Sequence, residues 1–226
     1  MDRTARLVRG FDRAARRMTG FLEARYGPVE AHVLIDRARD EYRRLIPELP
    51  DLHGRQPFTQ FVITTGWSLA YYRALAESEH PEKEAGELAY ALTANYVRSV
   101  PRVVGRLIGW LWFSKLFRKR LSLRAEQSQQ RRQSGDFVYR YVEGGVGDFD
   151  FGVDYLECAV LTFLKSHGTP KLAPYICALD RVSSDAFGWG LTRTTTLAEG
   201  GSRCDFRFKR GGETRVASTV LPVLPQ

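Results

Sequence analysis

The spacing of apolar residues changes character near residue 134, and this change sets the fold class. Residues 2–26, 28–46, 58–77 and 81–98 carry apolar side chains at helical intervals. From residue 137 to 142, Phe137, Tyr139 and Tyr141 alternate with Val138, Arg140 and Val142, as in a strand. We therefore expect an α+β fold, with a helical N-terminal half (residues 1–133) and an α+β part (residues 134–226) within one domain.

The α+β part is expected to be a small antiparallel sheet with two inserted helices. Strands are predicted at residues 137–142, 151–157, 189–197 and 203–209, with a short edge strand at 215–221. The inserted helices are predicted at residues 159–166 and 171–187, and Gly200, Gly201 and Ser202 would form a hairpin turn.

The chain carries more basic than acidic residues, which limits the classes of partner that it is expected to bind. The net charge is +8, from 34 Lys and Arg against 26 Asp and Glu, which favours anionic partners. Nucleic acid is not expected, because the charge is spread over several helices and joins no recognised binding motif. Three cysteines without CxxC spacing favour a reduced, cytoplasmic protein, and no apolar run is long enough for a signal peptide or a membrane span.

The most unusual composition lies in residues 102–132. Its first half is aromatic and aliphatic, whereas its second half is strongly basic. One interpretation is an amphipathic helix, from Arg106 to Arg132, that rests on a membrane or an acidic partner. The other, which we favour because buried helices are commonly this apolar, is a core helix that ends in a solvated basic segment.

Residues 158–208 contain all three cysteines and most of the candidate chemistry. Cys177, Asp180 and Ser184 fall at i, i+3 and i+7 of a predicted helix, which places a thiol, a carboxylate and a hydroxyl on one face. Such a face could form the wall of a pocket. The alternative is that Cys177 is a small buried apolar residue and Asp180 a surface or capping charge.

The other two cysteines lie next to predicted strands. Cys158 follows a strand and precedes a helix, where backbone N–H groups would lower its pKa and suit it to act as a nucleophile. Cys204 shares a strand face with Phe206 and Phe208, whereas Asp205 points the other way. Cys204 is therefore either a buried packing residue or part of a pocket floor.

Neither a metal nor a cofactor is expected. The four histidines have no metal-binding spacing; they are His32, His53, His80 and His167. The glycines of residues 143–148 match no dinucleotide fingerprint, and the chain has no Walker A loop and no GxSxG elbow.

Four segments together resemble a known family. They are Asp-Tyr-Leu-Glu-Cys at 154–158, Lys-Leu-Ala-Pro-Tyr-x-Cys-x-x-Asp at 171–180, Leu-Thr-Arg-Thr-x-Thr at 191–196, and Gly-Gly-x-x-Cys-Asp-Phe at 200–206. In this order they resemble the L-2-amino-thiazoline-4-carboxylic acid hydrolase family, over roughly residues 150–210. The resemblance implies hydrolysis of a cyclic C–N bond system, in which a cyclic isothiourea with a carboxylate opens to a carbamoyl-cysteine.

Residue chemistry then suggests roles for such a reaction. Cys158 or Cys177 would be the nucleophile, and Asp180 would hold the amidinium nitrogens or act as acid and base. Arg193 could bind the substrate carboxylate through its guanidinium group. The other residues expected to bind substrate are Tyr155, Glu157, Cys204 and Asp205.

Two further functions compete with the hydrolase. One is a non-catalytic small-molecule or lipid-binding domain, and the other is a tailoring cyclase or lyase of a small-molecule biosynthetic pathway. The expected partner is a small molecule with a carboxylate. A homo-oligomer, and a peripheral contact with a membrane or an acidic partner through residues 106–132, are also compatible with the sequence.

Overall fold

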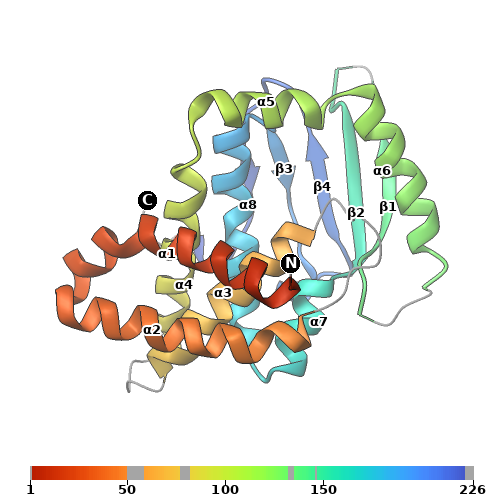
Figure 1. Cartoon of the computed structure of the whole chain (residues 1–226). Coiled ribbons are helices and arrows are strands. Elements are labelled where there is room, and N and C mark those ends of the chain that lie inside the picture. The colour runs from red at the N-terminus through yellow and green to blue at the C-terminus, as the bar shows by residue number, and fades with distance from the viewer. Residues whose placement is uncertain (1, 50–58, 77–81, 132–134, 146, 222–226) are drawn as a thin grey trace. The chain divides into compact units, whose positions relative to one another are not determined.

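The structure is a computed structural model that describes residues 2–49, 59–76, 82–131, 135–145 and 147–221 (Figure 1). Contacts divide these residues into two compact units. The helical unit comprises the described residues up to Ser99, and the sheet unit comprises those from Val100 onward. That the chain is a single domain stays a prediction.

The helical unit consists of four long helices, as the apolar spacing predicts. They are α1 (Arg3–Tyr26), α2 (Pro28–Leu45), α3 (Thr59–Ala76) and α4 (Glu82–Arg98), with a 3-10 turn, η1 (Ile46–Glu48), after α2. Gly27 separates α1 from α2 at φ 81°, a value that glycine adopts without strain, and Pro28 starts α2. The centre is aromatic: the Phe11 ring stacks on Tyr42 and Tyr71, with centroids 5.3 and 5.5 Å apart.

The sheet unit contains five strands and four longer helices among its described residues. The strands are β1 (Val138–Glu143), β2 (Phe151–Glu157), β3 (Leu191–Arg193), β4 (Cys204–Phe208) and β5 (Arg215–Val216). The helices are α5 (Arg102–Trp112), α6 (Lys115–Ser128), α7 (Ala159–Ser166) and α8 (Ala173–Phe187), with 3-10 turns η2 (Pro170–Leu172) and η3 (Leu197–Glu199). Helices α7 and α8 are inserted between β2 and β3, which confirms the predicted α+β class.

The sheet is mixed rather than purely antiparallel. Its strand order is β1-β2-β4-β3-β5, and every neighbouring pair is antiparallel except β3 with β5. In the β2–β4 register, Phe151 pairs with Phe208 and Tyr155 with Cys204. Since alternate residues share a face, these residues lie on the apolar face, and Asp154 and Asp205, which pair with each other, lie on the opposite one.

Tryptophan rings anchor α5 to the apolar core of the sheet unit. Trp112, at the end of α5, stacks on Trp189 with centroids 4.5 Å apart and meets the Phe208 ring edge-on at 5.4 Å. Phe151 and Phe208 stack at 5.0 Å on neighbouring strands. Figure 1 shows α5 crossing the end of α8, where the two helices are in contact.

The favoured interpretation of residues 102–132, a core helix that ends in a solvated basic segment, is wrong in its core helix. The segment forms two helices, because the Ser114 hydroxyl accepts the N–H of Phe117 and starts α6 as a new helix. The aliphatic residues of α5 are largely exposed rather than buried. Among the described helices, none combines the length and apolar composition needed to cross a membrane.

The predicted strand at residues 189–197 and its hairpin turn are also wrong in detail. The strand β3 has only three residues, and η3 stands between it and Gly200. Asp205 accepts the backbone N–H groups of Thr194 and Thr195, so these groups leave the strand ladder. The edge strand β5 is likewise limited to two residues and runs parallel to β3.

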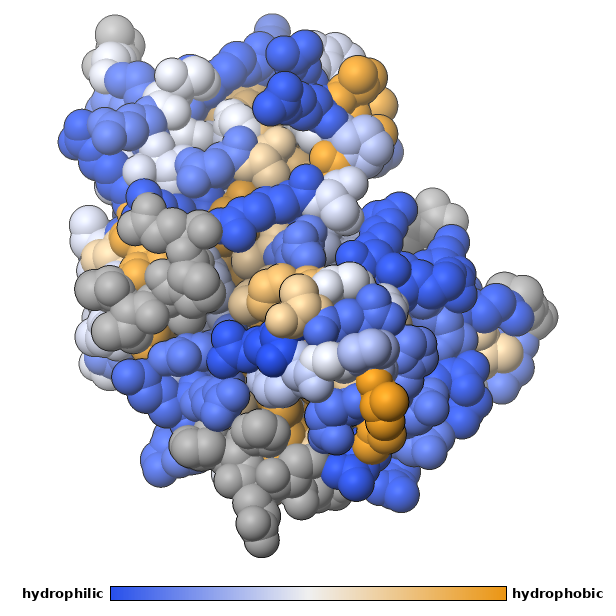
Figure 2. Space-filling model, turned by 90° about the vertical axis from the view of Figure 1, so that its left-hand side faces the viewer, coloured by the Kyte–Doolittle hydropathy of each residue, from blue (hydrophilic) through white to orange (hydrophobic). Residues whose placement is uncertain are grey.

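The exposed surface is mostly polar where Figure 2 shows it. On that face hydrophilic residues predominate, and apolar residues gather in a few small groups. Small exposed apolar groups are normal for folded proteins, so this face alone indicates no binding surface.

Candidate functional site

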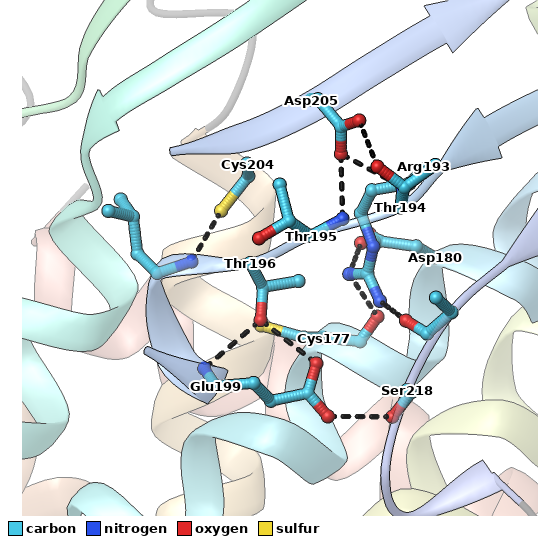
Figure 3. A network of polar contacts seen from close by, with 12 residues as sticks. Cys177, Asp180, Arg193, Thr194, Thr195, Thr196, Glu199, Cys204, Asp205 and Ser218 are labelled. Carbon is cyan, nitrogen blue, oxygen red and sulfur yellow. Dashed lines mark hydrogen bonds and ion pairs between the residues drawn. The ribbon is translucent and has the colours of Figure 1, made fainter. Parts of the chain in front are cut away.

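An ion pair between α8 and β3 is the centre of the candidate site (Figure 3). The Arg193 Nη1 donates to Asp180 Oδ2 at 2.6 Å and to the carbonyl oxygen of Cys177 at 3.1 Å. The Nη2 of Arg193 donates to the carbonyl oxygen of Ala217 at 2.7 Å. One guanidinium group therefore joins α8, β3 and the segment that follows β5.

Arg193 is unusual because its side chain has no exposed surface. The Phe206 ring lies below its guanidinium carbon, with the ring centroid 5.9 Å away. Its Nε is buried and has no hydrogen-bond partner among the described residues. A buried cation is tolerated only when it is paired and hydrogen-bonded, and here Asp180 and two carbonyl oxygens provide that compensation.

Asp180 is nearly buried but retains an opening to solvent, with 19% of its side chain exposed. Burial raises its pKa to about 6, and the charge and hydrogen bond of Arg193 oppose that rise. The second carboxylate oxygen, Oδ1, accepts no hydrogen bond from the described residues. Asp180 can therefore take up or release a proton near neutral pH.

The three cysteines are free thiols with raised pKa values. Burial raises the pKa of Cys158 and of Cys177, and it raises that of Cys204 to about 12. The expectation of a lowered pKa at Cys158 is therefore wrong. The N–H groups of Val160 and Leu161 do act in the lowering direction, but burial of the thiol outweighs them.

The cysteines share one electrostatic environment with Asp180. The negative charge of Asp180 contributes to the raised pKa of Cys158, Cys177 and Cys204. Tyr155 belongs to the same environment, since its raised pKa includes contributions from Asp180 and Cys158. We call the set formed by these residues the α8–β3 cluster; its members are Tyr155, Cys158, Cys177, Asp180, Arg193 and Cys204.

The cysteines of the α8–β3 cluster differ in how far they are exposed to solvent. Cys158 and Cys177 are half-buried. Cys204 is buried, and its sulfur accepts the backbone N–H of Leu197 at 3.3 Å. Burial distinguishes Cys204, since the Cys158 thiol also has backbone N–H groups, those of Val160 and Leu161, as hydrogen-bond donors.

Two of the residues expected from the sequence lie outside the α8–β3 cluster. Glu157 forms an exposed ion pair with Arg131 at 2.6 Å. Asp205 lies on the opposite face of the sheet, and its carboxylate holds the backbone of Thr194 and Thr195, which keeps the pKa of Asp205 low (Figure 3).

Glu199 was not among the expected site residues, but it lies beside the α8–β3 cluster (Figure 3). Its Oε2 accepts from the Thr196 hydroxyl at 3.0 Å, and its Oε1 accepts from the Thr219 N–H at 2.7 Å. These hydrogen bonds, with a contribution from the Arg193 charge, keep the pKa of Glu199 low. The Thr-x-x-Glu spacing at residues 196–199, which is typical of a capping box, could have indicated this arrangement.

The groups assembled here are suited to proton transfer and nucleophilic attack. Within the described residues, no group of three or more His, Cys, Asp or Glu side chains could hold a metal ion. The cluster offers an ionisable carboxylate, two half-buried thiols and a fixed cation.

Comparison of the sequence with known proteins and protein families gave one match. The family model described as L-2-amino-thiazoline-4-carboxylic acid hydrolase matches residues 60–208, more than half of the chain. The matched range includes every member of the α8–β3 cluster. No match was found among curated proteins or among solved structures.

Proposed function

The chain belongs to the L-2-amino-thiazoline-4-carboxylic acid hydrolase family, and from this premise we propose that the α8–β3 cluster is its active site. Family membership gives the chain a hydrolase function of the thiazoline-carboxylate type, at the ring C–N bond. The substrate is thus a small thiazoline with a carboxylate.

The Asp180–Arg193 pair is the observation that carries the assignment of the site. The pKa of about 6 makes Asp180 mainly a carboxylate at neutral pH, yet a far better base than an ordinary surface aspartate. Its Oδ2 is fixed by Arg193, and its Oδ1 remains available to a reacting group. Asp180 is therefore assigned the role of general base and acid.

The contacts of Arg193 favour a positioning role over the direct binding of the substrate carboxylate expected from the sequence. Both terminal nitrogens already donate to protein oxygens, and the side chain has no exposed surface. Arg193 would instead hold Asp180 in place and keep its pKa from rising further.

Hydrolysis at this site follows from the chemistry of the substrate. A nucleophile attacks the carbon between the ring sulfur and the nitrogens while Asp180 takes the proton of the nucleophile. The C–N bond of the ring then breaks, and Asp180 returns the proton to the departing nitrogen. Overall, one water is consumed: its oxygen becomes the carbonyl of the carbamoyl group and its two protons finish on the released nitrogen.

The candidate nucleophiles are the two half-buried thiols, Cys158 and Cys177. Because burial raises their pKa values, neither is a thiolate at neutral pH without a base, and the Asp180 carboxylate supplies one. After ring opening, water would attack the enzyme-bound carbon and release the thiol.

Asp180→Asn tests the assignment, with Asp185→Asn as the matched control on the exposed side of the same helix. Turnover of L-2-amino-thiazoline-4-carboxylate to carbamoyl-cysteine is measured by chromatography and mass spectrometry. We expect Asp180→Asn to lower kcat by about 10²–10⁴-fold, the usual contribution of a general base, with Asp185→Asn unchanged. Wild-type kcat/KM should rise with pH through about 6, as Asp180 loses its proton. Full activity in Asp180→Asn would refute the assignment.

Single Cys158→Ser and Cys177→Ser variants test the thiol step, with Cys204→Ser as the buried comparison. The variant that lacks the nucleophile should lose turnover and should fail to form the adduct that intact-mass analysis of a quenched wild-type reaction detects. Full turnover in both variants would exclude a covalent thiol step and leave water as the nucleophile.

A further inference from the structure

The helix α5 has two faces that differ sharply. Gly105 and Gly109 form the face toward α8: a Cβ on Gly105 would lie 2.7 Å from the carbonyl oxygen of Ala186, and one on Gly109 would collide with that of Phe187. Only glycine permits this close approach of the two helices. The rotation of α5 about its own axis is therefore fixed by its contact with α8.

This orientation leaves an apolar stripe on the opposite side of α5. In a helix of 3.6 residues per turn, Val103, Leu107 and Trp110 lie opposite to the two glycines. They are strongly exposed, with Val103 at 77%, Leu107 at 55% and Trp110 at 61%. Val104 and Leu111, which flank the stripe, are exposed as well. Exposed side chains of this size on one face of a helix indicate a binding surface.

Cations border the apolar stripe. From residue 100 to residue 125 the chain contains no acidic side chain. Its positively charged residues there are Arg102, Arg106, Lys115, Arg118, Lys119, Arg120 and Arg124. Arg102 and Arg106 are exposed on α5 itself, and Lys115 and Lys119 are exposed on the first turns of α6. The stripe thus combines apolar insertion with positive charge.

A hollow beside this surface has the same electrostatic character. It has a volume of about 320 Å³ and lies between α6 and β1, with Lys115, Arg118 and Lys119 in its lining. Arg118 is paired there with Glu143 at 3.5 Å. The two lysines form no ion pair with any residue that the structure describes.

We propose that α5 and the start of α6 form a docking surface for an anionic lipid bilayer, with the apolar stripe inserted at the level of the headgroups. A tryptophan and aliphatic residues on one face of a short helix, flanked by arginine and lysine, have the chemistry that binds a membrane interface without spanning the bilayer. A second copy of the chain is a poorer occupant, because the same cations would meet across such an interface.

Vesicle co-sedimentation of the full-length chain tests the proposal. We expect binding to vesicles of phosphatidylcholine mixed with phosphatidylglycerol, weak binding to phosphatidylcholine alone, and weaker binding as salt is raised. Trp110 is the exposed tryptophan, since Trp67 and Trp189 are buried and Trp112 is half-buried, so its emission should shift to shorter wavelength on binding. The shift should be absent in Trp110→Phe.

The variant Leu107→Ser/Trp110→Ser should bind the anionic vesicles more than about tenfold less tightly, because removal of one inserted large apolar side chain alone can cost about that factor. The matched control is Val29→Ser/Val33→Ser, which removes two exposed apolar residues from α2 and should bind like wild type. Both pairs are exposed, so thermal unfolding should change little in either variant.

Three results would overturn the proposal. They are no binding of wild type to the anionic vesicles, equal loss of binding in the α2 control, and a wild-type dimer in solution that Leu107→Ser/Trp110→Ser converts to monomer. The last result would assign the stripe to a second copy of the chain.

Discussion

Two Arg–Asp pairs of nearly equal length lie in very different surroundings. In the helical unit, Arg39 meets Asp12 at 2.7 Å through Nε and at 3.0 Å through Nη2, and both side chains are partly exposed. In the sheet unit, Arg193 meets Asp180 at 2.6 Å, and the arginine is completely buried. Distance alone therefore does not distinguish a surface contact from the centre of a candidate active site.

Burial makes the difference between the two pairs. Water and salt screen the Arg39–Asp12 pair, so it contributes little to stability. Arg193 is removed from water and Asp180 nearly so, and loss of the arginine therefore leaves an uncompensated carboxylate charge. The same burial raises the pKa of Asp180 to about 6, which is why this aspartate is the proposed general base.

Arg193→Met should have the largest effect on stability. It leaves the nearly buried Asp180 without its cation, and we expect the free energy of unfolding in urea to fall by about 3–5 kcal/mol at pH 7. The double variant Arg193→Met/Asp180→Asn removes both charges and should recover part of that loss. A decrease below about 1 kcal/mol in Arg193→Met would place this pair in the same class as the surface pair.

The pH dependence of Asp180 should be the next largest effect. Because its folded-state pKa of about 6 lies above its ordinary value of 3.8, the folded state binds this proton more tightly than the unfolded state. The free energy of unfolding of wild type should therefore fall as pH rises from about 4 to about 6, by on the order of 2–3 kcal/mol from this group alone. The free energies of unfolding of wild type and Asp180→Asn, measured by urea titration across this range, should approach each other at low pH and differ at high pH. Parallel curves would contradict the raised pKa.

Glu199→Gln should have a smaller effect on stability, with a pH dependence that can be compared with that of Asp180. The amide keeps the shape of the side chain but weakens the hydrogen bonds from Thr196 and Thr219. We expect a loss on the order of 1 kcal/mol, measured as a lower Tm at pH 7. The pKa of Glu199 is lowered, so Glu199 stabilises the fold above its ordinary pKa and loses this stabilisation as pH falls. This pH dependence is opposite in sign to that of Asp180. A Tm difference between Glu199→Gln and wild type that grew on acidification would contradict this.

Arg39→Ala should have the smallest effect. The exposed pair is expected to contribute less than about 1 kcal/mol, and that contribution should shrink further at high salt. Urea unfolding at low and high ionic strength measures both quantities. A loss comparable to that of Arg193→Met would mean that burial does not separate the two pairs.

The sequence predicted the helical unit well because its elements follow local rules. Apolar spacing located α1 to α4, and Gly27 with Pro28 located the boundary between the first two. The strand β2 was also predicted with its observed ends, since alternation is a local pattern too. Helix α5 was misjudged because composition shows that a helix is apolar but does not show which side its neighbours cover.

The candidate site was only partly predictable for a similar reason. The placement of Cys177 and Asp180 on one helix face follows from spacing, and Asp180 indeed meets Arg193. The burial of Arg193 and the raised pKa of Cys158 depend on residues distant in sequence, which no local pattern reports. Asp205 and Glu157 are adjacent in sequence to cluster members, but strand alternation and a contact with Arg131 separate them from the site.

The pairing of β5 with β3 has a consequence for synthesis on the ribosome. The Ala217 N–H donates to the carbonyl oxygen of Arg193, and the Ala217 carbonyl oxygen accepts from Arg193 Nη2. A nascent chain that has extended only to residue 214 already carries the three thiols, the carboxylate and the guanidinium group, but it lacks the acceptor that Ala217 provides. The contacts of the α8–β3 cluster are therefore complete only after residues 215–217 have been translated and have emerged to join the sheet.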